Sequence, residues 1–278
     1  MEASGLSLRS GPMYERLLLP VAILQGLWLL YRTPTLPAPV GDSGRVGPGY
    51  VPALKLAGVG DSIMVGTGVR EQCHSLTATY ARLLHGRLGC SVDWRVHGRN
   101  GATSAQVLAE VLPMVQRSHV YIVSCGVNDA THHVPVDEFA RNLGAILDEL
   151  RGKSPRAAIL YGGLPPLETF PALRWPLKAV LAERVRQMRA AAAEVIERHR
   201  RVFHFQFPPA MSPEHFASDG FHPHEQSCEQ WASGLLALWP PTLEVGGRRA
   251  SSDRRERKRA LGSGGGGQML PVVQPGRD

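Results

Sequence analysis

The sequence contains a serine, an aspartate and a histidine whose surroundings are suited to nucleophilic catalysis. Ser62 lies in the stretch GVGDSIMVGTG, directly after an apolar run and among glycines. A serine hydroxyl is a weak nucleophile at neutral pH unless a base within about 3 Å takes its proton. Asp219 and His222, three residues apart in SDGFH, offer that base and a carboxylate that would fix its tautomer. The three residues together predict acyl transfer through a serine, although each alone is more often a turn residue, a cap or a surface group.

Acyl transfer also requires donors for the negative charge that develops on the carbonyl oxygen. Gly101 in GRNGAT presents a backbone N–H that no side chain obstructs, and Asn128 in GVND offers an amide N–H. The backbone N–H of Ser62 is a third candidate. Taken singly, Gly101 is explained equally well by a turn with positive φ, and Asn128 by a helix cap. The case for an oxyanion hole therefore rests on the combination.

Strands and helices alternate along the chain and must position these residues. Short apolar runs rich in β-branched residues predict strands at 54–59, 92–98, 119–126, 156–163 and 202–205. Periodic segments between them predict helices at 75–89, 103–117, 136–152, 177–199 and 224–239. This order predicts a single domain in which one parallel sheet carries helices on both faces. Ligands bind at the carboxyl ends of the strands in such folds, which is where the four polar loops lie.

Four loop motifs, taken together, resemble those of the SGNH, or GDSL-type, hydrolases. They are GDS with Ser62, NGAT with Gly101, GVND with Asn128, and DGFH with Asp219 and His222, and they occur in the family's order. The first motif reads GDSIMVG rather than GDSL, which exchanges one aliphatic residue for another. The resemblance covers roughly residues 54–240.

This resemblance implies a flavodoxin-like three-layer α/β/α sandwich and an esterase or lipase that uses no cofactor. It implies that Ser62 is the nucleophile, that His222 is the base and that Asp219 orients His222. It also implies an oxyanion hole built from Ser62, Gly101 and Asn128. An acyltransferase that uses the same residues with an alcohol acceptor, and a binding protein that keeps the fold without reactivity, stay open as alternatives.

Other nucleophile and phosphate motifs are excluded at the same stretch. The G-x-S-x-G elbow needs glycine where Met64 stands. A P-loop needs a lysine after Gly66, and a dinucleotide fingerprint needs glycine in place of Ile63. The neighbouring histidines of HH and HPH lack accompanying ligands at metal spacing, so we expect no catalytic metal.

The loop 164–176, LPPLETFPALRWP, is the best sequence candidate for substrate contact. Loops of this length are often functional, and Leu167, Phe170 and Trp175 would suit an acyl chain. Coverage of a sheet edge explains the same side chains equally well. The expected substrate is a small-molecule or lipid ester.

The run 17–31, LLLPVAILQGLWLLY, is uncharged and lies between Arg16 and Arg32. As a helix it would extend roughly 22 Å, short of the roughly 30 Å hydrocarbon core. No A-x-A-like cleavage pattern follows it. We therefore expect a membrane-associated protein with an uncleaved anchor. An extracytoplasmic domain is one option, because arginines on both sides of the run leave the orientation undecided. A soluble secreted form and an apolar helix packed on the domain stay open.

Composition divides the chain into four expected segments. They are an anchor or signal-like segment at 1–32, a Pro/Gly-rich linker at 33–52, the hydrolase domain at 53–241, and a basic, Gly-rich disordered tail at 242–278. From Gly246 onward, eight Lys or Arg and three acidic residues contribute +5 of the net charge of +7. The nearly neutral body argues against a nucleic-acid partner. The four cysteines fit isolated buried thiols better than a pairing of Cys73 with Cys90, and the oligomeric state is not predicted.

Overall fold

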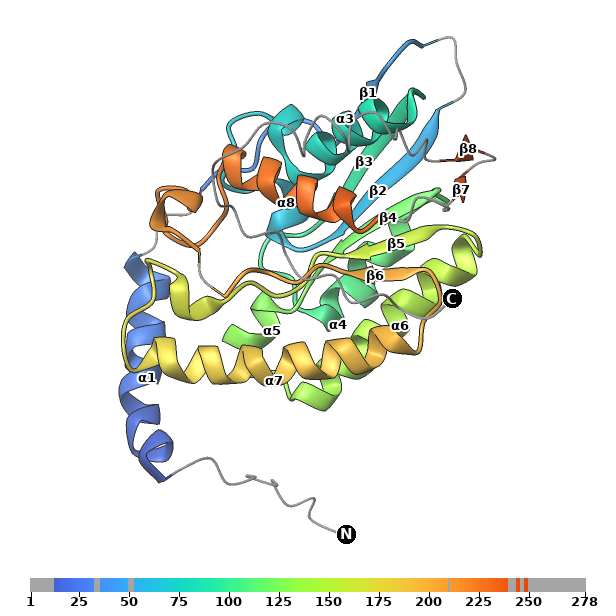
Figure 1. Cartoon of the computed structure of the whole chain (residues 1–278). Coiled ribbons are helices and arrows are strands. Elements are labelled where there is room, and N and C mark those ends of the chain that lie inside the picture. The colour runs from blue at the N-terminus through green and yellow to red at the C-terminus, as the bar shows by residue number, and fades with distance from the viewer. Residues whose placement is uncertain are drawn as a thin grey trace, which may run out of the picture.

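The computed structural model describes residues 13–32, 36–49, 53–209, 211–239, 244–245 and 248–249. Within these residues six strands form one sheet in the order β1-β3-β2-β4-β5-β6 (Figure 1). The strands are β1 (Ser43–Val46), β2 (Leu54–Gly60), β3 (Val92–Gly98), β4 (Val120–Ser124), β5 (Ala158–Tyr161) and β6 (Val202–His204). Strands β2 to β6 are parallel, and β1 pairs antiparallel with β3 at the edge. Without β1, the order is that of a flavodoxin-like sheet, as predicted.

Helices cover both faces of the sheet and give the molecule three layers, so the predicted single α/β domain is confirmed. The helices are α1 (Met13–Arg32), α2 (Ser62–Val65), α3 (Leu76–Leu88), α4 (Ser104–Gln106), α5 (Val127–Thr131), α6 (Val136–Lys153), α7 (Leu177–Glu197) and α8 (Glu225–Ala237). Helices α3 and α8 lie on one face, and α6 and α7 on the other (Figure 1). Short 3₁₀ turns lie at Gln72–His74, Leu167–Thr169 and Pro213–His215.

Burial explains why these elements form. All five residues of β4, VYIVS, are buried, because both faces of a parallel sheet are covered by helices. Helix α6 buries a stripe that recurs every three to four residues, namely Phe139, Leu143, Ile146, Leu147 and Leu150. The core therefore consists of two apolar layers, one on each side of the sheet.

The helix expected at 103–117 is interrupted. Only Ser104–Gln106 is α-helical, and a wider π-type turn at Val107–Val111 and a 3₁₀ turn at Leu112–Met114 follow it. Pro113 lies within the last turn and has no N–H to donate to the carbonyl four residues earlier. The apolar period continues through the segment, but the α-helical hydrogen bonds do not.

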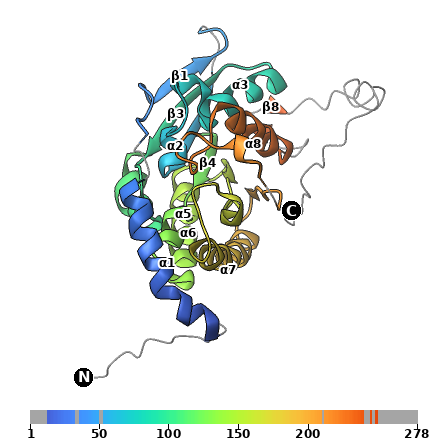
Figure 2. The same cartoon turned by 90° about the vertical axis from the view of Figure 1, so that its left-hand side faces the viewer.

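Helix α1 packs on the domain, against α7 (Figure 2). Its residue Ala22 is buried, whereas Leu24, Leu27 and Trp28 are exposed. Among the described residues, no helix combines the length and the apolar character that crossing a bilayer requires. Contact of residues 17–31 with a membrane stays a prediction.

The expected linker at 33–52 contains ordered structure that the sequence analysis missed. Strand β1 occupies the otherwise free edge of β3, Arg45 forms an ion pair of 2.5 Å with Asp93, and the Ser91 hydroxyl donates to the Pro48 carbonyl at 2.8 Å. Within the expected tail at 242–278, β7 (Glu244–Val245) pairs with β8 (Arg248–Arg249), and the rest of that prediction lies outside the described residues.

The four cysteines are free thiols. Cys90, Cys125 and Cys228 are buried, as expected, whereas Cys73 is exposed.

Candidate active site

Ser62 lies at the carboxyl end of β2, where the order of the sheet reverses. β2 ends at Gly60 and α2 begins at Ser62. Asp61 caps this helix, because its Oδ1 accepts the N–H of Ile63 at 3.1 Å. As the first residue of α2, Ser62 has a backbone N–H for which the helix itself provides no acceptor. The turn therefore presents both the hydroxyl and the N–H of Ser62 at the edge where α/β proteins bind ligands.

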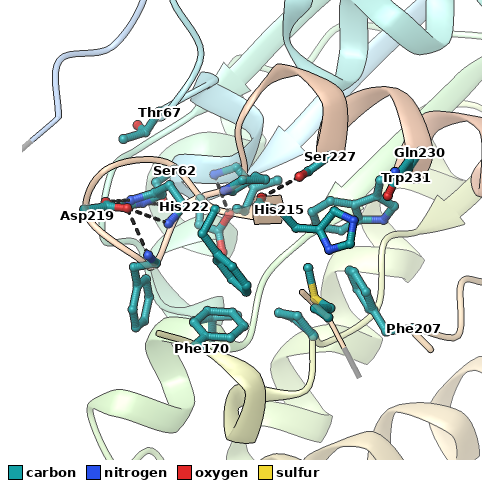
Figure 3. Close-up of a pocket in the computed structure, with 18 of the residues that line it drawn as sticks. Ser62, Thr67, Phe170, Phe207, His215, Asp219, His222, Ser227, Gln230 and Trp231 are labelled. Atoms are coloured by element: carbon teal, nitrogen blue, oxygen red, sulfur yellow. Dashed lines mark hydrogen bonds and ion pairs between the residues drawn. The ribbon is translucent and has the colours of Figure 1, made fainter. Parts of the chain in front are cut away.

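The structure brings Ser62, His222 and Asp219 into one hydrogen-bonded series (Figure 3). His222 Nε2 lies 2.9 Å from Ser62 Oγ, and His222 Nδ1 lies 2.6 Å from Asp219 Oδ2. The other carboxylate oxygen, Oδ1, accepts the backbone N–H groups of Phe221 and His222 at 2.9 and 3.0 Å. Because 160 residues separate Ser62 from His222, only the fold could bring them together.

The environment of Asp219 favours its ionised form. Burial alone would raise the pKa of this carboxyl, but the hydrogen bonds from the His222 side chain and from the two backbone N–H groups outweigh burial, so the pKa lies below its usual value. An ionised Asp219 keeps the proton of His222 on Nδ1 and leaves Nε2 free to accept the proton of Ser62. The arrangement can therefore activate the serine hydroxyl.

Asp61 has a different environment, which the sequence analysis did not single out. Burial raises the pKa of Asp61 to about 7, although the N–H of Ile63, the charge of His222 and the hydroxyl of Ser124 act in the opposite direction. The Ser124 hydroxyl donates to Asp61 Oδ1 at 3.3 Å. The GDS motif pointed to Ser62 and gave no sign that its aspartate is buried.

Asp61 should make the stability of the domain depend on pH. Because its pKa is raised in the folded state, its stabilising contribution is complete below about pH 4 and is lost as the pH rises towards 7. In Asp61→Asn this titration is absent. We expect the unfolding free energy of the variant, relative to wild type, to increase by about 2 to 3 kcal/mol between pH 5 and pH 8. Urea unfolding of both proteins at the two pH values measures this. The same change of unfolding free energy with pH in the variant and in wild type would contradict it.

Gly101 and Asn128, the predicted oxyanion donors, line the same cavity as Ser62. Gly101 follows β3 and adopts a φ of +72°, a conformation that glycine reaches without strain. Asn128 Nδ2 donates to the carbonyl of Ala102 at 3.0 Å. Since an amide nitrogen carries two hydrogens, this bond fixes the plane of the amide and leaves a second N–H for a ligand.

A buried network that the sequence analysis missed holds these loops in place. Asp129 Oδ2 accepts the Ser104 N–H at 2.8 Å, and Asp129 Oδ1 accepts the Ser104 hydroxyl at 2.5 Å. Asn142 Nδ2 on α6 donates to the same hydroxyl at 3.1 Å. Burial raises the pKa of Asp129, and the two bonds from Ser104 oppose that rise. The only signal in the sequence was the aspartate directly after Asn128 in GVND.

A cavity of about 980 Å³ extends from Ser62 along α8. Figure 3 shows Ser62, His222 and Asp219 on one side of it and Phe207 and Trp231 on the other. The part of the lining that comes from α8 and from the loop after β6 is here named the aromatic arm. It contains Phe205, Phe207, Trp231, Gly234 and Ala237, together with the polar side chains of Glu229, Gln230 and Ser233. The rings of Phe207 and Trp231 pack edge to face, with centroids 4.8 Å apart.

The three candidate substrate residues of the loop 164–176 have different positions. Phe170 lines the cavity and packs against Phe216 and Phe221, with ring centroids 4.7 and 5.1 Å apart. Leu167 is buried in the core, and Trp175 is 67% exposed, and neither lines the cavity. The apolar character of the loop was visible in the sequence, but the direction of each side chain was not.

One group of residues could hold a metal ion in the part of the chain that the structure describes. Glu71, Cys73 and His74 place ligand atoms within 4.8 Å of one another. None of the three lines the cavity. Catalysis without a metal or a cofactor stays a prediction.

The model of the GDSL-like lipase/acylhydrolase family matches residues 59–227, more than half of the chain. The chain belongs to this family. The matched region contains all four motifs, and membership makes the chain a carboxylic ester hydrolase, in agreement with the predicted family and enzyme class.

Solved structures of a lipase and of a carbohydrate esterase share the fold at low sequence identity. The lipase Lip_vut3 from a goat rumen metagenome is 17% identical, and the match covers 69% of this chain and 100% of that one with a TM-score of 0.59. The family 3 carbohydrate esterase of Clostridium thermocellum is 18% identical and matches 76% of this chain and 100% of its own length, with a TM-score of 0.52. No curated protein matches the sequence. These likenesses support the fold and say nothing about the substrate of this chain.

Proposed function

We propose that the protein hydrolyses esters of apolar carboxylic acids through an acyl-enzyme on Ser62. The observation that carries the proposal is the 2.9 Å contact between Ser62 Oγ and His222 Nε2, with Asp219 on the other side of the imidazole. Ser62 Oγ attacks the ester carbonyl carbon while His222 takes its proton, which forms a tetrahedral oxyanion. His222 then returns the proton to the departing alcohol. Water, deprotonated by His222, attacks the acyl carbon, releases the acid and restores the Ser62 hydroxyl.

The oxyanion would be held by the backbone N–H groups of Ser62 and Gly101 and by the free N–H of Asn128. All three residues line the cavity. Donors fixed in advance are worth several kcal/mol because they need no reorganisation as charge develops. Here the cap of α2, the turn at Gly101 and the bond from Asn128 to Ala102 provide that fixation.

The aromatic arm supports an apolar acyl group as the substrate. The rings of Phe205, Phe207 and Trp231 line it, and the whole cavity, at about 980 Å³, has room for an acyl chain of several carbons. Phe207 and Trp231 form two sides of the arm. Phe207 comes from the loop after β6, and Trp231 comes from helix α8. We place the acyl chain between them, with its carbonyl at Ser62.

Hydrolysis of p-nitrophenyl esters from acetate to long acyl chains, with and without an added alcohol, tests this function. We expect the free acid as the product and an increase in kcat/KM as the chain lengthens to fill the arm. Transfer of the acyl group to the alcohol in preference to water would instead identify an acyltransferase. Binding of the esters without turnover would identify a binding protein on the same fold.

A further inference from the structure

The segment that precedes the family-matched region is attached to the domain at both of its described ends. On α1, the side chain of Gln25 donates from Nε2 to the carbonyl of Trp175 at 2.8 Å and accepts the N–H of Leu177 at 3.0 Å. One side chain thus satisfies two backbone groups at the start of α7, where a helix has N–H groups without intrahelical acceptors. Ala22, one turn earlier, is 2% exposed. These contacts fix one face of α1 on the domain.

The second attachment follows at 36–49. Strand β1 pairs with β3 over four residues, and the N–H of Val96 donates to the Asp42 carbonyl at 2.7 Å. Pro39 lies beside Gly66, at the end of the short helix that Ser62 begins. The segment therefore passes close to the site at Gly66 before it forms the outer strand of the sheet.

Two side chains of this segment, Leu29 and Leu36, line the same cavity as Ser62 and Asn128. Leu29 is partly buried against the apolar core on the α7 side of the sheet, whereas the aromatic arm lies along α8 on the opposite side. Figure 2 shows α1 and α8 well apart. The cavity therefore has a second apolar wall, to which Leu29 of α1 contributes from outside the family-matched region.

We propose that this α1 wall selects the alcohol part of the ester. The inference rests on the proposed function, because it takes the acyl chain to lie in the aromatic arm. With the ester carbonyl carbon at Ser62, the acyl chain and the alcohol chain extend in different directions. The side opposite the arm is the one that Leu29 lines. An alcohol with an aliphatic chain matches the leucine side chain there. Leu29 is thus a specificity-determining residue, and Gln25 is a positioning residue that holds α1 in place.

Helix α1 supplies its own control. Leu27 is 59% exposed and does not line the cavity, whereas Leu29, two residues further on, does. The variants Leu29→Trp and Leu27→Trp thus make the same chemical change on the same helix. Only the first places a larger side chain against the cavity.

The measurement is the ratio of kcat/KM for hexyl butyrate to that for ethyl butyrate, determined in the full chain. A ratio within one variant cancels the fraction of active protein, so partial misfolding does not affect it. We expect Leu29→Trp to lower the ratio about tenfold, since loss of space for a few methylenes is worth at least that factor. Leu27→Trp should leave it within twofold. Equal ratios in the two variants would overturn the proposal.

A second series fixes the direction of the substrate. With p-nitrophenol as the constant alcohol, the ratio for octanoate to acetate should change less than twofold in Leu29→Trp. A fall in this ratio, with no change in the butyrate ratio, would place the acyl chain at Leu29 and overturn the assignment. Gln25→Leu, which loses both hydrogen bonds, should raise KM for hexyl butyrate several-fold and leave kcat for ethyl butyrate within twofold. Equal losses on both esters would show a role in folding alone.

Failure of the proposed function is recognised separately. Ser62→Ala is measured in the same assays, and activity that survives in it would reject the acyl-enzyme rather than the α1 wall. A further comparison needs no turnover. Phosphonofluoridates with an ethoxy or a hexyloxy group phosphonylate Ser62 and release fluoride, and the two rates of phosphonylation are compared. Loss of preference for the hexyloxy reagent in Leu29→Trp supports the α1 wall, and an unchanged preference overturns it.

Discussion

Replacing Ser62 by alanine is expected to lower kcat for ester hydrolysis about 10⁴-fold or more. Alanine lacks the oxygen that would carry the acyl group, so His222 has no nucleophile to activate. The proposed oxyanion donors and the cavity stay in place and should still support slow attack by water. The expected variant is therefore a folded protein with a small residual rate and no acyl-enzyme.

The structure also predicts that this variant folds normally. The Ser62 hydroxyl bonds His222, but the cap of α2 is the carboxylate of Asp61. Removal of the hydroxyl should therefore change the free energy of unfolding by less than about 1 kcal/mol. The measurement combines steady-state hydrolysis of a p-nitrophenyl ester with a thermal melt, and mass spectrometry of the trapped acyl-enzyme.

Ser227→Ala is the matched control. Ser227 lines the same cavity, but its hydroxyl donates to the backbone carbonyl of His215. We expect its kcat to stay within about tenfold of wild type. Comparable rates for Ser62→Ala and wild type would exclude Ser62 as the nucleophile, and comparable losses in both serine variants would indicate a general effect on the cavity.

Replacing Gly60 by alanine is expected to have the largest effect on folding, a loss of more than about 4 kcal/mol. Gly60 lies opposite Ser124 in the ladder between β2 and β4 and has a φ of +154°. A Cβ at this position would lie 1.9 Å from the Ser124 carbonyl oxygen, which also accepts the Asp61 N–H. The Ser124 carbonyl belongs to the backbone of β4, so it cannot rotate away from the new Cβ as a side chain could. The two strands would have to separate at the end that carries Ser62.

Gly86→Ala makes the same substitution where nothing opposes it. Gly86 is an exposed residue of α3, and a Cβ there would meet no heavy atom within 4 Å. Alanine in a helix should stabilise the domain by about 0.4 to 1 kcal/mol. Urea unfolding and the yield of soluble protein compare the two variants. A melting temperature of Gly60→Ala within a few degrees of wild type would contradict the steric account.

Local sequence patterns were sufficient to predict the class of fold and the order of its elements. The β2 and β4 segments are apolar over lengths typical of buried strands, and the α6 segment repeats its apolar residues at helical spacing, so local patterns were sufficient. The four motifs identified the family, since each is a short stretch whose residue types can be recognised without coordinates. Pro113 shows the limit of such patterns, because the apolar period continued where the hydrogen bonds of the helix could not.

Which side chains share the site depends on tertiary packing, which local patterns do not reveal. Strand β1 has four residues and no apolar period, and it exists because β3 offers it a free edge. Leu167 and Phe170 are close in one apolar loop and are both buried, yet only Phe170 lines the cavity. Leu29 and Trp231 line that cavity from opposite ends of the chain. Contacts between residues so distant in sequence depend on how helices pack across a sheet, and no local pattern records that packing.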